Sequence, residues 1–193
     1  MNAAEHLLNV VDVGATCWEG QPPPGQASEI IGVGLTVVEL RAGERLAKHR
    51  LLVRPARSTI SPFRTELTGL TPTEVDGGLS FAEACRTLAA RHRTGLLPWA
   101  GWGDYDRDRF TRQCRRTRAA YPFGHRHTNA KVAFTAAHAL RGRPGMAQAL
   151  KIADLPLEGR HHRGADDAWN IAALVLDLSG RGAWPGIADP DRC

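Results

Sequence analysis

The sequence predicts an α/β domain, in which helices pack on a mixed β-sheet. Apolar, β-branched runs typical of strands come first, and helical patterns then alternate with a further strand pattern. The 193 residues, 42% hydrophobic and 23% charged, have the size and composition of one globular domain. Because no linker or repeat divides the chain, we expect a single domain over residues 7–180 and a C-terminal tail over residues 181–193.

Three strands are expected to open the sheet as a meander. Residues 7–13, 29–40 and 46–53 are apolar runs, and a turn at residues 41–43 separates the last two. Short links of this kind join neighbouring antiparallel strands. A shorter apolar run over residues 96–102 predicts a fourth strand.

Helices are expected after the first three strands. Residues 65–71 are typical of a short helix and turn. Ser80 begins a longer helix with a capping box, because Glu83 follows three positions later. Further helices are expected from Asp106 into the basic residues 115–118, over residues 131–140, over residues 145–152, and after Asp167. Residues 121–127 are expected to form a loop.

The charge and the cysteines indicate the class of partner and the compartment. A formal net charge of +5 favours a polyanionic partner. The four cysteines are widely spaced, which indicates reduced thiols rather than a disulfide framework or a zinc site. No signal-peptide pattern opens the chain, and no apolar run approaches the length of a membrane span. We therefore expect a cytoplasmic protein with no membrane partner.

Three aspartates stand where functional groups of α/β sheets gather. Asp12 ends the first strand, Asp106 begins a helix after a later strand, and Asp167 begins the last helix. Carboxylate oxygens favour magnesium or manganese over zinc. His162, five residues before Asp167, is a candidate base for deprotonating water. Alternatively, Asp166 and Asp167 only cap and charge-complement the last helix, and this segment alone leaves both interpretations open.

Several motifs occur in the order found in one enzyme family. They are VDVGATCW at residues 11–18, LTGLT at residues 67–71, WGDYD at residues 102–106, and His162 with Asp167. On these motifs the chain resembles the DEDDh branch of 3′–5′ exonucleases, above all the histone-mRNA and small-RNA trimming exonucleases and their bacterial relatives. The resemblance implies an RNase H-like fold, with a mixed five-stranded sheet and helices on both faces.

The resemblance also implies an activity and roles for single residues. It implies metal-dependent hydrolysis at the 3′ end of single-stranded RNA or DNA, with release of nucleoside monophosphates. The catalytic residues would be Asp12, Asp106, Asp167 and His162, of which the aspartates would hold a pair of Mg²⁺ or Mn²⁺ ions and His162 would be the general base. The substrate-binding residues would be Ala15, Thr16, Trp18 and Tyr105. Tyr105 would stack on the terminal base or be a half-buried aromatic at a helix start, and Trp18 would lie by the nucleotide or cover its loop.

The chain departs from the family pattern at two positions. Relatives carry a glutamate that bridges both metals where this chain has Gly14, and usually a second glutamate at Gly32. Loss of such a ligand predicts weakened activity and an incompletely occupied metal pair. Glu19, Glu29 and Asp104 are the candidates to replace it through water.

Three functions therefore stay open at this point. The chain is an exonuclease of normal or reduced activity, an inactive relative that binds nucleic-acid 3′ ends, or a protein-interaction domain that keeps only the fold. Joint retention of the aspartates and the histidine argues against the last. A glutamate introduced at Gly14 is expected to fit and to raise activity.

Overall fold

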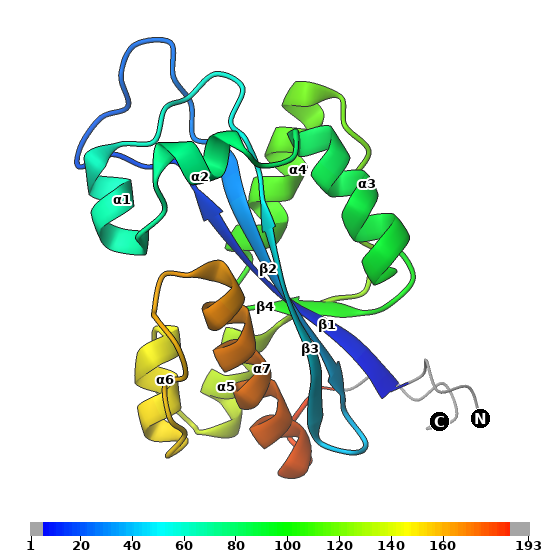
Figure 1. Ribbon diagram of the computed structural model, residues 1–193. Helices are drawn as coiled ribbons and strands as arrows, with labels where there is room; N and C mark the ends of the chain where they lie inside the picture. Colours follow the sequence, from blue (N-terminus) through cyan, green and yellow to red (C-terminus); the bar gives the residue numbers. More distant parts are fainter. Residues whose placement is uncertain (1–5, 186–193) are drawn as a thin grey trace.

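Strand β1 (Leu7–Ala15) is central because its side chains are apolar on both faces. Leu8 and Val10 belong to one hydrophobic core, whereas Val11 and Val13 belong to a second. Since successive side chains of a strand point to opposite faces, the sheet has to be covered on both sides. The computed structural model, which describes residues 6–185, shows helices on both sides of the sheet (Figure 1).

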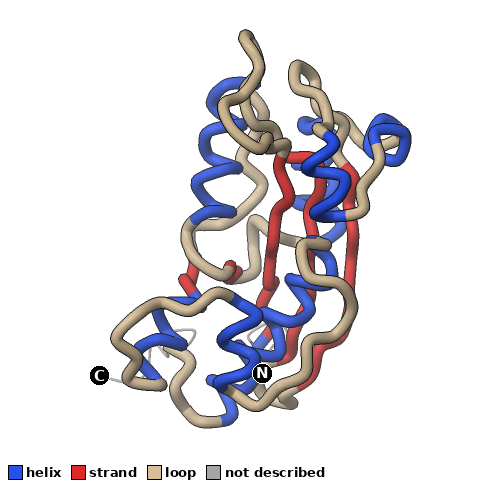
Figure 2. Tube along the Cα trace, turned by 90° about the vertical axis from the view of Figure 1, so that its left-hand side faces the viewer, coloured by secondary structure: helices blue, strands red, loops and turns tan. Residues whose placement is uncertain are grey.

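The sheet has five strands in the order β3-β2-β1-β4-β5, as the resemblance implied. The other strands are β2 (Ile30–Glu39), β3 (Glu44–Leu52), β4 (Trp99–Gly101) and β5 (His127–Asn129). The predicted meander is confirmed, because β1, β2 and β3 pair antiparallel, and β4 and β5 add parallel strands beyond β1. Figure 2 shows the strands in red with helices in blue on both sides of them. Strand β5 was missed, because its three polar residues carry no apolar alternation and extend a segment predicted as loop.

One face of the sheet, here called the α7 face, carries Leu8 and Val10 and is covered by three helices. These are α5 (Ala130–Ala137), α6 (Met146–Ile152) and α7 (Gly164–Gly180). The apolar stripe predicted for the last helix is buried in this core, with Ile171, Leu174, Val175 and Leu178 at most 1% exposed.

The opposite face packs against α3 (Phe81–His92) and α4 (Tyr105–Thr117). The capping box predicted at Ser80 is present, because Ser80 N donates to Glu83 Oε2 and Glu83 N donates back to Ser80 Oγ. Two short helices, α1 (Pro62–Thr68) and α2 (Pro72–Asp76), follow β3 and precede α3 along the chain. Helix α2 was missed, although Thr71 and Glu74 form a second capping box that the sequence already displayed.

Three further expectations concern membranes, cysteines and the tail. Within residues 6–185, no helix is long and apolar enough to cross a membrane. Cys17, Cys85 and Cys114 are free thiols. Most of the expected tail, residues 186–193 including Cys193, lies outside the described part of the chain.

Candidate active site

The three predicted metal ligands line one cavity of about 400 Å³ beside the ends of β1 and β4. Asp12 comes from β1, Asp106 from the first turn of α4 and Asp167 from the first turn of α7. Other predicted site residues on the same wall are Gly14, Ala15, Tyr105 and His162. The structure thus brings together residues from distant parts of the chain.

Asp12 lies on the α7 face of β1, in the same alternation as Leu8 and Val10. Burial and the nearby carboxylates of Asp106 and Asp167 raise the pKa of Asp12 well above its usual value. A cation bound among these carboxylates would relieve the repulsion that raises this pKa.

Asp106 is placed by the backbone of β1 and by the glycine that ends β4. Its Oδ1 accepts a hydrogen bond from Val13 N at 3.0 Å. A Cβ at Gly101 would lie 2.6 Å from its Oδ2, so the aspartate occupies space that a side chain there would take. Burial raises the pKa of Asp106 to about 7, although the bond from Val13 opposes that shift.

A contact between two glycines brings Asp167 close to Asp12. Gly34 of β2 stands directly opposite Asp12 in the ladder, and a Cβ there would lie 2.0 Å from the carbonyl oxygen of Gly164. Gly164 begins α7 and its own Cβ position is 3.2 Å from the carbonyl oxygen of Asp12. Only residues without side chains let the start of α7 approach the sheet this closely. The contact sets the position of Asp167, which follows in the first turn of α7.

Two histidines hold the carboxylate of Asp167. His161 Nδ1 lies 2.9 Å from its Oδ1, and the backbone N–H of His162 donates to its Oδ2 at 2.9 Å. Burial raises the pKa of Asp167, and the bond with His161 opposes this. His161 was not predicted, because nothing in the sequence separates its role from that of its neighbour.

His162, the predicted general base, is exposed at the edge of the cavity and has a left-handed backbone with φ of 70°. Its ring stacks on that of His161, with 3.8 Å between the centroids. Burial and His161 lower the pKa of His162, whereas Asp167 opposes that shift. The imidazole is therefore mostly uncharged at neutral pH and able to accept a proton.

Arg64, which was not predicted, lies where a side chain of residue 14 would begin. A Cβ at Gly14 would be 2.3 Å from Arg64 Nη2. Arg64 comes from α1 and is only 8% exposed. The expectation that a glutamate fits at Gly14 stays a prediction, and it requires the end of the flexible Arg64 side chain to move aside. Nothing in the sequence marks this arginine among the 25 lysines and arginines.

The residues present fit a divalent cation. Asp12, Asp106 and Asp167 offer hard carboxylate oxygens, which suit Mg²⁺ or Mn²⁺. The ligand atoms of His161, His162 and Asp167 also lie within 4.8 Å of one another. At Gly14, however, the wall presents a guanidinium instead of a carboxylate, so it offers no ligand there to bridge to a second ion.

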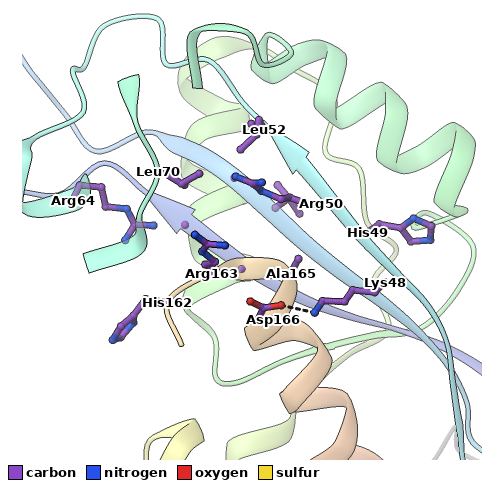
Figure 3. Close-up of a pocket in the computed structure, with 14 residues that line it drawn as sticks. Lys48, His49, Arg50, Leu52, Arg64, Leu70, His162, Arg163, Ala165 and Asp166 are labelled. Carbon is purple, nitrogen blue, oxygen red and sulfur yellow. Dashed lines mark hydrogen bonds and ion pairs between the residues drawn. The ribbon is translucent and has the colours of Figure 1, made fainter. Parts of the chain in front are cut away.

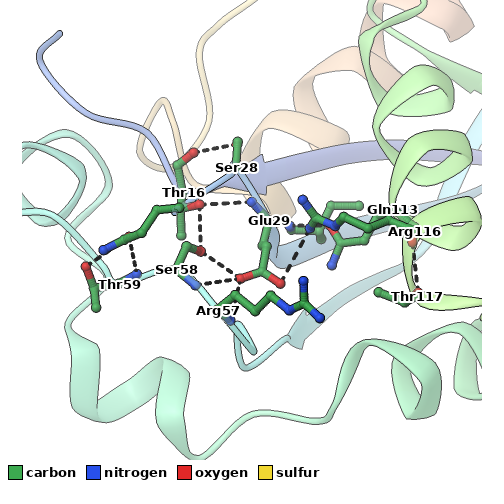
Figure 4. Close-up of polar contacts among 11 residues, drawn as sticks. Thr16, Ser28, Glu29, Arg57, Ser58, Thr59, Gln113, Arg116 and Thr117 are labelled. Atoms are coloured by element: carbon green, nitrogen blue, oxygen red, sulfur yellow. Dashed lines mark hydrogen bonds and ion pairs between the residues drawn. The ribbon is translucent and has the colours of Figure 1, made fainter. Parts of the chain in front are cut away.

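Two predicted substrate-binding residues do not line the cavity. Thr16 is fully buried, and its Oγ1 accepts from Glu29 N at 2.9 Å and lies 3.0 Å from Ser58 Oγ (Figure 4). Trp18 is half-buried in the loop after β1 and is not part of the wall. In this structure the side chains of Thr16 and Trp18 belong to the loop after β1 and not to the cavity wall. A role for them in substrate binding stays a prediction.

None of the three candidate substitutes for the glutamate lines the cavity. Glu29 is buried and accepts three hydrogen bonds, at 2.7 to 2.9 Å, from residues 57–58 (Figure 4). Burial alone would raise the pKa of Glu29, but these hydrogen bonds hold it below its usual value. Asp104 pairs with Arg107 at 3.1 Å, and Glu19 is exposed.

A second cavity, of about 320 Å³, shares Gly14 with the first. Figure 3 shows the side chains that line this second cavity. Gly32 stands opposite Gly14 in the ladder, and a Cβ there would have no atom closer than Leu51 O at 3.8 Å. The basic residues on the wall of this second cavity are Lys48, Arg50, Arg64 and Arg163. Arg64 and His162 line both cavities.

Known proteins share this sequence pattern and this fold. The exonuclease family (RNase_T) matches residues 10–175. The 3′-5′ exonuclease Snipper of Drosophila melanogaster is 29% identical over 90% of this chain and 69% of its own length. The 3′-5′ exoribonuclease 1 of Homo sapiens is 27% identical over 88% of this chain, which spans only 51% of that protein. Among solved structures, the nuclease domain of 3′hExo, a DEDDh family member bound to rAMP, superposes on this chain with a TM-score of 0.82. The match covers 95% of this chain and 96% of that domain at 24% identity, which shows that the two share a fold.

Proposed function

The chain belongs to the exonuclease family, and from this premise we propose that it is a metal-dependent 3′–5′ exonuclease that releases nucleoside monophosphates from single strands. The observation that carries the proposal is the single cavity lined by Asp12, Asp106, Asp167 and His162. Relatives named exonuclease and exoribonuclease support it. The name of the human relative favours RNA over DNA as the main substrate.

The residues of the cavity divide the work of hydrolysis. Asp12, Asp106 and Asp167 would hold Mg²⁺ or Mn²⁺, which supplies positive charge for the phosphate in the transition state. His162 accepts the proton of the attacking water at a ring nitrogen, because its lowered pKa leaves it uncharged. His161 keeps the carboxylate of Asp167 oriented through their 2.9 Å contact.

We propose that Tyr105 stacks on the last base of the strand. It lies on the cavity wall, is 47% exposed, and has the guanidinium of Arg109 at 4.9 Å from its ring centre. Stacking on an aromatic ring contributes about 1–3 kcal/mol per base and does not read sequence. We therefore propose cleavage with little base preference.

The location in the cell stays a proposal as well. The free thiols of Cys17, Cys85 and Cys114 are in keeping with the cytoplasmic location expected from the sequence. A tagged chain followed by microscopy or by cell fractionation would test this expectation.

The activity is tested on single-stranded RNA and DNA labelled at the 5′ end. With Mg²⁺ or Mn²⁺, but not with a chelator, the labelled strand should shorten stepwise from its 3′ end and release nucleoside monophosphates. A 3′-blocked strand should resist, and Asp167→Asn and His162→Ala should abolish or strongly slow the shortening. Tight binding of the strands without shortening, in either metal, would favour the inactive relative that binds 3′ ends. The absence of a carboxylate at Gly14 is the observation that supports this alternative. If strands are neither bound nor shortened, the proposal is wrong.

A further inference from the structure

Arg64 reaches the active-site cavity from outside the sheet. It lies in the first turn of α1, where Ser61 Oγ accepts a hydrogen bond from its backbone N at 3.0 Å. Its side chain lines both cavities, as does that of His162. Figure 3 shows these two side chains among those that line the second cavity. At Gly14 the chain has no side chain, and Nη2 of the guanidinium fills the vacant space.

Within residues 6–185, no acceptor lies within hydrogen-bond distance of this guanidinium, although its charge opposes the burial and the carboxylates that raise the pKa of Asp12. Arg64 is 8% exposed, and its Nε has no hydrogen-bond acceptor. None of the ion pairs within residues 6–185 includes it. Buried charges in proteins are normally paired, since an unpaired one loses its hydration without compensation. A buried guanidinium at a cavity wall whose N–H groups have no acceptor among the described residues is therefore free to donate to an anionic ligand.

The charge of the cavity indicates how this cation is used. Asp12, Asp106 and Asp167 bring three negative charges when ionised, and Arg64 brings one positive charge. One divalent ion balances the remainder. A glutamate at position 14 together with a second divalent ion would add one net positive charge, and Arg64 alone adds the same charge.

We propose that Arg64 binds the scissile phosphate in place of a second metal ion, so that the chain works with a single divalent cation. This inference rests on the proposed exonuclease function. A guanidinium suits the task, because it donates two parallel hydrogen bonds to phosphate oxygens and stays charged. Water oxygen bonds to phosphorus while the bond to the 3′-oxygen breaks. His162 takes a proton from the water, Arg64 holds the non-bridging oxygens, and the departing 3′-oxygen takes a proton from solvent.

The phosphate contact is tested by calorimetry on the full chain saturated with Mn²⁺, with adenosine 5′-monophosphate and adenosine as probes. The unmodified chain should bind the monophosphate more tightly than adenosine. Arg64→Gln should weaken binding of the monophosphate by about tenfold or more and leave adenosine unchanged. Arg50→Gln is the matched control, since Arg50 lines the neighbouring cavity, is half-exposed and faces Glu74 at 3.8 Å, and it should bind like the unmodified chain. Should Arg64→Gln not fold, Arg64→Lys keeps the charge without the two-pronged geometry and should bind with intermediate affinity.

The number of ions is counted by titrating Mn²⁺ into the chain saturated with the monophosphate. We expect one ion per chain, and two in the double variant Gly14→Glu, Arg64→Gln. Two ions in the unmodified chain, or equal monophosphate affinity in Arg64→Gln, would overturn the inference even if the chain trims RNA. Loss of the phosphate contact in Arg64→Gln, one bound ion and no trimming in any metal would support the Arg64 site and refute the exonuclease proposal.

Discussion

Replacing Gly34 with alanine should displace the start of α7 and destabilise the whole domain. The new Cβ would lie 2.0 Å from the carbonyl oxygen of Gly164, 2.1 Å from its carbonyl carbon and 2.4 Å from Ala165 N. Non-bonded heavy atoms are ordinarily about 3.5 Å apart, so α7 and β2 must separate by roughly 1 Å or more. These are backbone atoms, which cannot rotate away as a side chain would.

The magnitude follows from the cost of overpacking, which is typically about 1–3 kcal/mol. Because rigid backbone is involved, we expect the upper end, about 3 kcal/mol. For a domain of this size, about 2–4 °C are lost per kcal/mol, so the Tm should fall by roughly 6–12 °C. Circular dichroism during heating measures this shift. A second scan with Mn²⁺ should show a smaller metal-induced rise in Tm than the unmodified chain gives, because Asp167 moves with the start of α7.

Gly32→Ala is the matched control for this substitution. Gly32 lies two residues earlier on the same face of β2, where the nearest atom to an added Cβ is Leu51 O at 3.8 Å. Alanine there should leave the Tm unchanged or raise it slightly, since glycine weakens a strand. If Gly34→Ala unfolds at the same temperature as Gly32→Ala, the close contact with Gly164 does not position α7.

Three further predictions concern burial and charge. Because burial raises the folded pKa of Asp106 from its ordinary value of 3.8 to about 7, its contribution to metal-free stability is full below pH 3.8 and is lost as the pH rises through 7. Unfolding midpoints in urea should follow this trend, and Asp106→Asn should flatten it between those values. Glu29→Ala should cost about 1–3 kcal/mol at neutral pH by leaving buried donors unpaired, while calorimetry finds metal affinity unchanged, because Glu29 does not line the cavity. Phe110→Ala should cost about 3–5 kcal/mol in urea denaturation, since the ring is fully buried and packs on Phe81 and Phe123.

Much of the fold could be predicted because it depends on local patterns. Apolar runs gave β1, β2 and β3, and helical spacing gave the buried stripe of α7. Strand β5 escaped, because its three polar residues become a strand only by pairing with β4, which is a tertiary event. The aspartates were found because strand ends and helix starts are places that a sequence pattern can mark.

The rest of the site depends on contacts between elements that no local pattern records. Gly34 and Gly164 could each be an ordinary glycine, and only their mutual approach explains why neither has a side chain. His161 looks equivalent to His162 along the chain, yet its ring faces Asp167 whereas His162 offers Asp167 a backbone N–H.

Gly14 shows why a departure from a motif needs the structure for its interpretation. Along the sequence the position counts only as a lost carboxylate, and that predicts an impaired metal pair. In the folded chain the space beside Gly14 is filled by the guanidinium of Arg64 from α1. The local charge is therefore positive where a glutamate would make it negative. Restoring glutamate alone would then create an ion pair with Arg64 instead of a metal bridge, because the two groups would meet directly. The single substitution Gly14→Glu should therefore fail to raise activity, and only its combination with Arg64→Gln should recruit a second ion.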